Sequence, residues 1–377
     1  MPALRTGRLR LILPSGDIIE RCGRDPGPEA VLQAHRWRAL WRILIGGEGG
    51  FADGYLDGDW STPDLGHLLE LLMANEAALG PKAKSSRLSR ARNRLLHRLR
   101  ANTRRGSRRN IAAHYDLGND FYRLWLDDGM SYSSALYASD NSLERAQDAK
   151  LDRIVSLLEL TGGESILEIG CGWGALAERL LRRCNANLFA VTLSAEQLGY
   201  ARTRLAAEIE QGKADLRLLD YREIAGRFDR IASIEMLEAV GERYWPLYFG
   251  KLSSSLRRGG VAVLQVITIA EDRFDAYRKR PDFIQRYIFP GGMLPTRSII
   301  GDAAARAGFV LTHHESFGDS YARTLREWRE RFLRAWPKIE RLGFDDRFRR
   351  MWDYYLAYCE VGFRTGAVDV GFFKLVQ

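Results

Sequence analysis

The sequence predicts an α/β protein, in which a small N-terminal accessory domain precedes a doubly wound, Rossmann-like sheet. Two features of the 377-residue chain support this fold class. From residue 165 onward, short apolar runs alternate with amphipathic stretches, as strands and helices do in a doubly wound parallel sheet. The stretch VAVLQVITI, residues 261–269, is apolar almost throughout, which is typical of a strand buried on both faces.

The first 80 residues form the predicted small domain. Residues 9–17 (LRLILPSGD) favour a strand followed by a turn, and residues 28–46 favour a packed helix or a helix–strand pair. Residues 64–75 (DLGHLLELLMAN) predict an amphipathic helix with a Leu/Met face. A basic segment, residues 81–109, separates this domain from the large domain, residues 110–377.

The large domain alternates strands and helices. The predicted strands are residues 165–170, 187–193, 214–220, 228–237 and 261–269. The predicted helices are residues 174–184, 194–211 and 244–260, and the last of them stops at a glycine pair. This order predicts parallel strands with helices on both faces.

Composition limits the class of protein. Hydrophobic residues make up 46% of the chain, which is enough for packed cores. No apolar run approaches the roughly 18 residues of a membrane-spanning helix, and the N-terminal apolar run is too short for a signal peptide. The four cysteines show no CxxC and no metal-type spacing. We therefore expect a cytoplasmic protein without disulfides or zinc.

The basic residues are concentrated in one segment. Residues 82–109 hold twelve Lys or Arg and no Asp or Glu, which exceeds the net charge of +9 for the whole chain. Leu88, Leu95 and Leu99 lie near one helical face, so the segment favours a basic amphipathic helix on an anionic phospholipid membrane. Each basic residue near such a surface contributes about 1 kcal/mol. A solvated linker is the alternative for the unbound state.

A glycine-rich corner follows the first predicted strand of the large domain. Gly170, Gly172 and Gly174 allow a tight turn that lets a ligand lie against the backbone at a helix N-terminus. The spacing differs from a P-loop and from the dinucleotide motif, and Thr192 stands where a ribose-binding acid would be expected. Glu168 would repel phosphate but suits a cationic ligand such as S-adenosylmethionine. A purely structural turn is the alternative interpretation.

The start of the next predicted helix carries a capping signal. Ser194 and Gln197 form the pattern S-x-x-Q, which is typical of a capping box. This structural role is compatible with ligand binding, because the box lies at the carboxyl edge of the sheet, where ligands bind in such folds.

Seven stretches of the large domain carry a specific likeness to a known family. They are HYDLGNDFYRLWLD, MSYSSALY, LEIGCGWG, VTLSAEQ, SIEMLEAVGERYW, FPGGMLPT and SYARTLREW. Together they resemble the cyclopropane-fatty-acyl-phospholipid synthases, which include the mycolic acid cyclopropane synthases. The resemblance implies an S-adenosylmethionine-dependent methyltransferase that acts on the cis double bond of an unsaturated acyl chain in a phospholipid. It further implies that a carbocation forms, a bound bicarbonate ion removes a proton, and a cyclopropane ring closes.

The resemblance also implies which residues contact the cofactor. Glu168, whose negative charge suits a cationic ligand, lies close in sequence to the glycines among these contacts. The implied cofactor contacts are Tyr132, Ser133, Gly170, Gly172, Gly174, Thr192, Leu193, Gln197 and Tyr221. A cationic reaction needs a dry site with aromatic faces, and the aromatic stretches of the chain can supply one, although core packing is the ordinary role of most such rings.

The implied bicarbonate site departs from the family at two positions. Glu238 and Tyr321 match the family, whereas Ser134 stands where the family has Cys and Gln265 where it has His. Ser and Gln can still donate to an anion, but neither supplies the charge of a protonated His. Bicarbonate therefore stays open, and so does a product with a methylene or methyl branch in place of the ring.

Two further residues match family positions without a settled role. Cys359 matches a cysteine that has been marked as a possible nucleophile, although direct methyl transfer to an alkene needs none and a buried Cys is ordinarily inert. His114 is either a polar contact near the cofactor or a core histidine.

Two other functions would each explain part of the sequence. A nucleic-acid methyltransferase would explain the basic segment, but the sequence contains no NPPY-type motif and no nucleic-acid-binding module, so we expect no nucleic-acid partner. A lipid-binding protein without activity would explain the altered anion site, but Glu238, Tyr321 and the glycine corner are retained. We expect an enzyme peripheral to the inner face of the cell membrane, with a homodimer through the accessory domain as an analogy.

Overall fold

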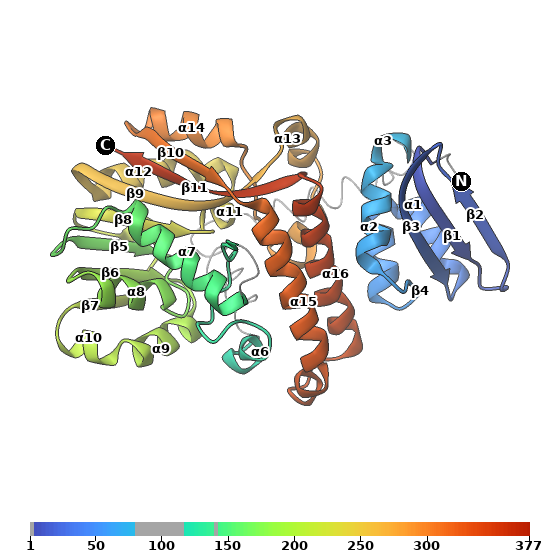
Figure 1. Cartoon of the computed structure of the whole chain (residues 1–377), viewed down its shortest axis with the longest axis horizontal. Helices are drawn as coiled ribbons and strands as arrows, with labels where there is room; N and C mark the ends of the chain where they lie inside the picture. Colours follow the sequence, from blue (N-terminus) through green and yellow to red (C-terminus); the bar gives the residue numbers. More distant parts are fainter. Residues whose placement is uncertain (1–3, 80–116, 139–141) are drawn as a thin grey trace.

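The computed structural model describes residues 4–79, 117–138 and 142–377, and it shows two parts side by side (Figure 1). Residues 4–79 build a four-stranded sheet with its own helices, here called the N-terminal unit. Residues from 117 onward build a seven-stranded sheet flanked by helices. The predicted basic helix, with Leu88, Leu95 and Leu99, lies outside the described residues, as does His114.

The N-terminal unit has the strand order β2-β1-β3-β4. Its elements are β1 (Thr6–Ile12), β2 (Ile18–Cys22), β3 (Asp25–Ala34), α1 (Trp37–Leu56), β4 (Trp60–Ser61), α2 (Leu65–Ala74) and α3 (Glu76–Leu79). The predicted amphipathic helix is confirmed as α2, and the Asp64 carboxylate caps it by accepting from the His67 backbone N–H at 2.9 Å. The segment 28–46 is a strand followed by a helix.

The large sheet has the order β10-β11-β9-β8-β5-β6-β7. Its strands are β5 (Ser165–Ile169), β6 (Asn187–Thr192), β7 (Ala214–Leu218), β8 (Phe228–Ile234), β9 (Leu256–Ile269), β10 (Val310–Ser316) and β11 (Val368–Val376). The five parallel strands are those that the sequence predicted. The sequence did not predict β10 and β11, and β11 corrects the all-parallel expectation because it is antiparallel to both of its neighbours.

Helices cover both faces of this sheet. They are α6 (Asn119–Arg123), α7 (Leu143–Leu157), α8 (Ala175–Arg183), α9 (Ala195–Arg204), α10 (Ala206–Glu210), α11 (Leu237–Val240), α12 (Trp245–Ser255), α13 (Glu271–Arg278), α14 (Arg297–Arg306), α15 (Gly318–Arg341) and α16 (Asp346–Arg364), with short helical turns at Tyr221–Glu223, Glu242–Tyr244 and Ile284–Ile288. Along β5, Ile166 and Leu167 belong to different core clusters, one on each face. The doubly wound arrangement is therefore confirmed.

Three predicted boundaries were wrong. The single helix predicted for 194–211 divides at Leu205, whose φ of −108° and ψ of 24° are not helical, into α9 and α10. The helix predicted for 244–260 ends at Ser255, because Leu256 already belongs to β9 and is fully buried. The strand predicted for 228–237 ends at Ile234, where Glu235 takes a positive φ.

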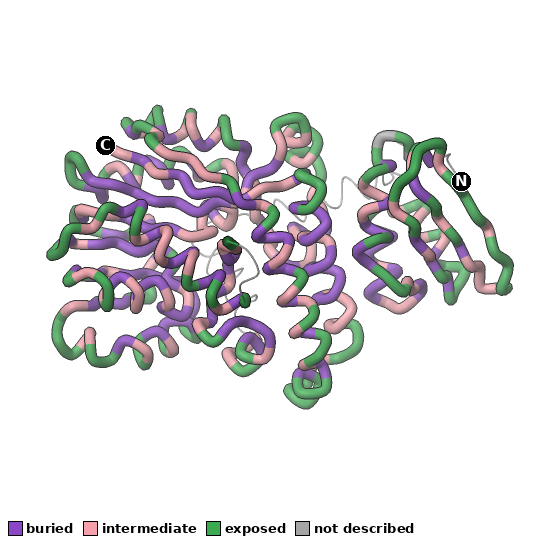
Figure 2. The backbone as a smooth tube through the Cα atoms, in the orientation of Figure 1, coloured by how far each residue is buried: buried purple, intermediate pink, exposed green. Residues whose placement is uncertain are grey.

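A hairpin of two long helices, α15 and α16, lies between the large sheet and the N-terminal unit (Figure 1). Figure 2 shows buried stretches along the central strands and along both helices. At the contact with α1, the Tyr55 hydroxyl donates to Asp353 at 2.6 Å, and the Arg329 guanidinium donates to the other oxygen of Asp353 at 2.6 Å. One core cluster includes residues of both parts, so the two sheets share a hydrophobic interior.

No helix among residues 4–79, 117–138 and 142–377 is both long and apolar enough to cross a membrane.

Candidate functional site

A cavity of about 2410 Å³ connects the carboxyl edge of the large sheet with the N-terminal unit. At the sheet end it is lined by the corner between β5 and α8 and by the ends of β6 and β8. At the other end it is lined by leucines of β1 and by residues of α1 and α2.

The glycine corner has the conformation that the sequence predicts. Gly170, Gly172 and Gly174 have φ values of 85°, 52° and 86°, which L side chains rarely adopt. A Cβ on Gly172 would meet nothing within 4 Å, and this residue lines the cavity with Gly170. A Cβ on Gly174 would lie 3.2 Å from the Cβ of Ala201. Gly172 therefore leaves room for a ligand, whereas Gly174 serves the packing of α8 against α9.

The side chains of Glu168 and Lys150 are both buried beside this corner. Burial raises the pKa of the Glu168 carboxyl to about 8, although the charge of Lys150 opposes the shift. One oxygen of Glu168 has no hydrogen-bond partner in the described part of the chain. Burial also lowers the pKa of Lys150 to about 8, and its ammonium donates to the Ser133 hydroxyl at 2.8 Å. An unpartnered buried carboxyl facing a cavity fits a cationic ligand such as S-adenosylmethionine.

The other predicted cofactor contacts gather around the same end of the cavity. Tyr132, Ser133, Thr192, Leu193, Gln197 and Tyr221 all line it. The Gln197 backbone N–H donates to the Ser194 hydroxyl at 3.3 Å, so the predicted helix cap is present. The Thr192 hydroxyl donates to the side-chain oxygen of Gln197 at 2.9 Å, which fixes this amide at the cavity wall. Of the predicted contacts, Gly174 alone does not line the cavity.

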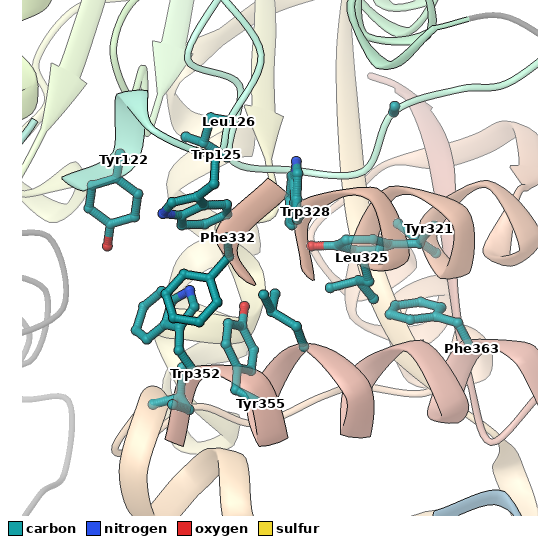
Figure 3. Packing of buried hydrophobic residues seen from close by; sticks show 14 of the residues in the cluster. Tyr122, Trp125, Leu126, Tyr321, Leu325, Trp328, Phe332, Trp352, Tyr355 and Phe363 are labelled. Carbon is teal, nitrogen blue, oxygen red and sulfur yellow. The ribbon is translucent and has the colours of Figure 1, made fainter. Parts of the chain in front are cut away.

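A cluster of buried aromatic side chains packs beside the site (Figure 3). Trp125 follows α6, Trp328 lies on α15 and Tyr355 on α16, and Figure 3 shows their rings close together between the helices. The ring of Tyr132 lies 5.3 Å from that of Trp328, and the Tyr132 and Tyr355 hydroxyls are hydrogen-bonded at 2.9 Å. Such faces attract a positive charge in a site from which water is excluded.

The predicted residues of the anion site converge on a residue that the sequence analysis missed, Glu235. Its Oε1 accepts from the Ser134 backbone N–H at 2.9 Å and from the Gln265 side-chain amide at 2.7 Å, and its Oε2 accepts from the Tyr321 hydroxyl at 2.7 Å. Glu235 is half-buried and lines the cavity. An acidic residue directly after a parallel strand lies at the edge where ligands bind, but the strand predicted for 228–237 contained Glu235, so this signal was hidden.

Glu238 lies beside Glu235 with fewer partners. Its Oε1 accepts from the backbone N–H of Ile267, and its Oε2 has no hydrogen-bond partner among the residues described. Burial raises the pKa of Glu238 to about 8, and the negative charge of Glu235 adds to the shift. Two carboxyl groups with different surroundings therefore face one cavity.

Ser134 and Gln265 are not arranged to hold a free anion. The Ser134 hydroxyl donates to the carbonyl of Ala135 at 2.9 Å, and its backbone N–H is bound to Glu235. Neither Ser134 nor Gln265 lines the cavity. The donors that the family resemblance assigns to bicarbonate are engaged by a carboxylate of the protein, so these residues do not fit a bound bicarbonate ion.

Cys359 lies on α16 and lines the cavity. Burial raises the pKa of its thiol well above the ordinary value. A protonated thiol is a poor nucleophile, so the surroundings of Cys359 favour a packing role.

Comparison with known proteins places this geometry in a family. Residues 102–373 match the family model described as mycolic acid cyclopropane synthetase. The tuberculostearic acid methyltransferase UfaA1 of Mycobacterium tuberculosis is 40% identical over 365 residues, which are 91% of this chain and 82% of that protein. The cyclopropane-fatty-acyl-phospholipid synthase of Escherichia coli K12 is 36% identical over 332 residues, 87% of this chain and 83% of that one.

Solved structures agree with these similarities. The mycolic acid cyclopropane synthase CmaA1, complexed with SAH and CTAB, superposes with a TM-score of 0.67 at 30% identity over 72% of this chain and 98% of that one. Coclaurine N-methyltransferase, at 19% identity and a TM-score of 0.66, shares the fold. The chain thus belongs to the mycolic acid cyclopropane synthetase family and is an S-adenosylmethionine-dependent methyltransferase.

Proposed function

We propose that this enzyme methylates the cis double bond of an unsaturated acyl chain in a phospholipid and closes a cyclopropane ring. The observation that carries the proposal is the continuous cavity, which joins the glycine corner to a leucine-rich end in the N-terminal unit. A long apolar chain fits such a passage better than a nucleobase or a small polar substrate. The name of the Escherichia coli relative, a cyclopropane-fatty-acyl-phospholipid synthase, supports the same substrate class.

The residues of the sheet edge would hold the cofactor. When bound, S-adenosylmethionine supplies an electrophilic methyl group, and its transfer leaves a positive charge on the acyl chain. Glu168, Gly172 and Gln197 lie where they can contact the cofactor. The rings of Tyr132 and Tyr355, which line the cavity, can stabilise the cationic chain, and the buried site keeps water from quenching it.

The lipid reaches the cavity, in this proposal, through an exposed apolar face of α1. Trp37, Trp41, Leu44 and Ile45 are 54%, 64%, 71% and 60% exposed. Their spacing places them on one side of the helix, and all four line the cavity. A bilayer is the partner that suits them, because an acyl chain can pass from it into the protein without crossing water.

A branched product is the second candidate. The relative from Mycobacterium tuberculosis is named for a methyl-branched acid and is 40% identical to this chain. A hydride shift that moves the positive charge to the methylated carbon, followed by loss of a methyl proton, gives a methylene branch with the same mass as the ring. A saturated methyl branch needs a hydride donor in addition.

The test is mass spectrometry of phospholipid fatty acids after expression in a bacterial host that lacks its own synthase. We expect a gain of one CH₂ per modified chain, and NMR will distinguish a ring from a methylene branch. The control is Gly172→Val, which fills the open side of the glycine corner and should give no product. Unchanged fatty acids with the wild-type enzyme would contradict the proposal.

A further inference from the structure

We infer that the Glu235 carboxylate is the base of this reaction, an anion supplied by the chain itself in place of bicarbonate. This inference rests on the proposed function, because it names the group that takes the proton from the methylated acyl chain.

The first support is the set of donors. A backbone N–H, an amide NH₂ and a hydroxyl reach Glu235 from three separate segments, at 2.7 to 2.9 Å. Carboxylate and bicarbonate share a planar O–C–O group that accepts hydrogen bonds at two oxygens. Because the Glu235 carboxylate occupies these donors, they are not available to a bicarbonate ion.

The second support is the backbone of Glu235. Its φ is +50°, an uncommon value for a residue other than glycine. The Glu235 N–H donates to the Gln265 carbonyl at 2.7 Å. The main chain and the side chain of Glu235 are therefore both hydrogen-bonded to Gln265 on β9. Such a conformation persists where the surroundings fix it, and it is concentrated at functional sites.

The third support is position. Glu235 follows β8 directly and lines the cavity, and the next residue, Met236, is the nearest side chain to Gly170, with its Cγ 3.3 Å from the place of an added Cβ. Glu235 is therefore the sequence neighbour of a residue that packs against the glycine corner, and its carboxylate accepts from Tyr321 in the same cavity. A base at this place can reach a proton on the newly added methyl group.

The fourth support is charge. Burial raises the pKa of Glu235, and three hydrogen bonds together with the ammonium of Lys150 oppose that shift in favour of the ionised form. Glu238, which accepts one such bond from Ile267, lacks this support. The two carboxyls thus differ in their surroundings, since Glu235 has three donors that favour a carboxylate and Glu238 has one, and acid–base sites use such differences to divide roles.

The proton transfer balances without another reactant. The methylated chain carries a positive charge on the carbon next to the methylated one. A C–H bond of the new methyl group breaks, its electron pair forms the last C–C bond of the ring, and the proton passes to Glu235. The product is neutral, and the Glu235 carboxylic acid then loses its proton to water. If a hydride first shifts from the methylated carbon to the cationic carbon, the C–H electron pair of the methyl group forms a C=C bond instead, and the same base serves a methylene-branched product.

The test uses the purified full chain, S-adenosylmethionine with a labelled methyl group, and vesicles of phosphatidylglycerol that carry one cis double bond per acyl chain. Activity is measured in buffer freed of carbon dioxide and again with added bicarbonate. We expect the wild-type rates to agree within about twofold, whereas Glu235→Gln, which keeps the shape but cannot take a proton, should lose about 100-fold or more.

A second variant, Glu235→Gly, distinguishes a lost base from a damaged fold. Glycine accepts the positive φ at this position, so the variant should fold and bind cofactor like the wild type in calorimetry. It leaves a space lined by the three donors. Added bicarbonate or formate should therefore raise the activity of this variant by at least about tenfold.

Three results would overturn the inference: a wild-type rate that depends on bicarbonate, Glu235→Gln with nearly full activity, or Glu235→Gly that binds cofactor but is not restored by either anion. If the wild-type enzyme transfers no labelled methyl to lipid in any buffer, the proposed function itself fails, and the role of Glu235 in it fails too.

Discussion

At the scale of single residues, Glu235 and Glu238 show how surroundings separate two identical side chains. They lie three positions apart and line one cavity, but Glu235 accepts three hydrogen bonds and Glu238 leaves one oxygen without a partner in the described structure. An unpartnered carboxyl oxygen can face a positive charge that develops on the substrate. Glu238 is therefore placed to stabilise that charge by electrostatics.

Glu238→Gln should reduce kcat by about 100-fold, because an amide gives no such stabilisation. Cofactor affinity should stay within about twofold, since Glu168 rather than Glu238 adjoins the glycine corner. Stopped-flow turnover and calorimetry on the same preparation will measure both. A variant with normal kcat would remove Glu238 from the reaction.

Cofactor binding should strengthen as the pH rises. The pKa values of Glu168 and Lys150 are each about 8, so raising the pH from about 6 to 8 adds negative charge at the first and removes positive charge at the second. Both changes favour a cationic ligand, and the affinity should rise by up to about tenfold per pH unit. Calorimetric titration of Glu168→Gln is the control, and it should show a flatter pH profile.

The sequence located the cofactor end of the site better than the reactive end. The glycines, Thr192 and Gln197 follow strands that periodicity predicts, so their meeting at one edge follows from the fold class. Glu235 could not be selected in this way, because the predicted strand continued through residue 237 and hid its turn. The donors from Tyr321 and Gln265 converge on it only through contacts distant in sequence.

At the scale of elements, α1 has two faces with different roles. Its buried residues, including Phe51 and Tyr55, pack into the shared core, whereas its first turns expose Trp37 and Trp41. The apolar pattern of residues 28–46 was compatible with a helix or with a helix–strand pair. The reason is that β3 and α1 both carry apolar residues and are separated by two residues alone. Packing against α16 resolves the question in favour of a strand followed by a helix.

The double variant Trp37→Ser/Trp41→Ser should weaken binding to phospholipid vesicles by about tenfold or more, since two large interfacial rings are lost. Vesicle co-sedimentation will measure it. Leu247→Ser on α12 is the matched control, because Leu247 is 51% exposed but does not line the cavity. Equal binding by both variants would show that α1 does not contribute to membrane binding.

At the scale of the whole molecule, the active cavity needs both parts. The glycine corner belongs to the large sheet and the leucine-rich end to the N-terminal unit, so neither part alone encloses the passage. Sequence could divide the chain, but it could not show that a buried bond between Tyr55 and Asp353, 298 positions apart, joins the pieces.

Tyr55→Phe should lower the free energy of unfolding by about 2 kcal/mol, because it leaves one oxygen of a buried carboxylate without its donor. It should also raise KM for lipid more than KM for cofactor. Urea unfolding and steady-state kinetics will test both effects. Tyr200→Phe, on the outer helix α9, is the control and should change neither.

The reversed strand β11 has a consequence for the nascent protein. β10 is bonded in the sheet to β11 alone, and β11 connects it to β9. A polypeptide that stops short of residue 368 therefore leaves residues Val261–Ile269 of β9, which pair with β11, as an open margin, a hydrophobic template on which a second copy could assemble. Solubility during synthesis thus depends on the arrival of the final strand.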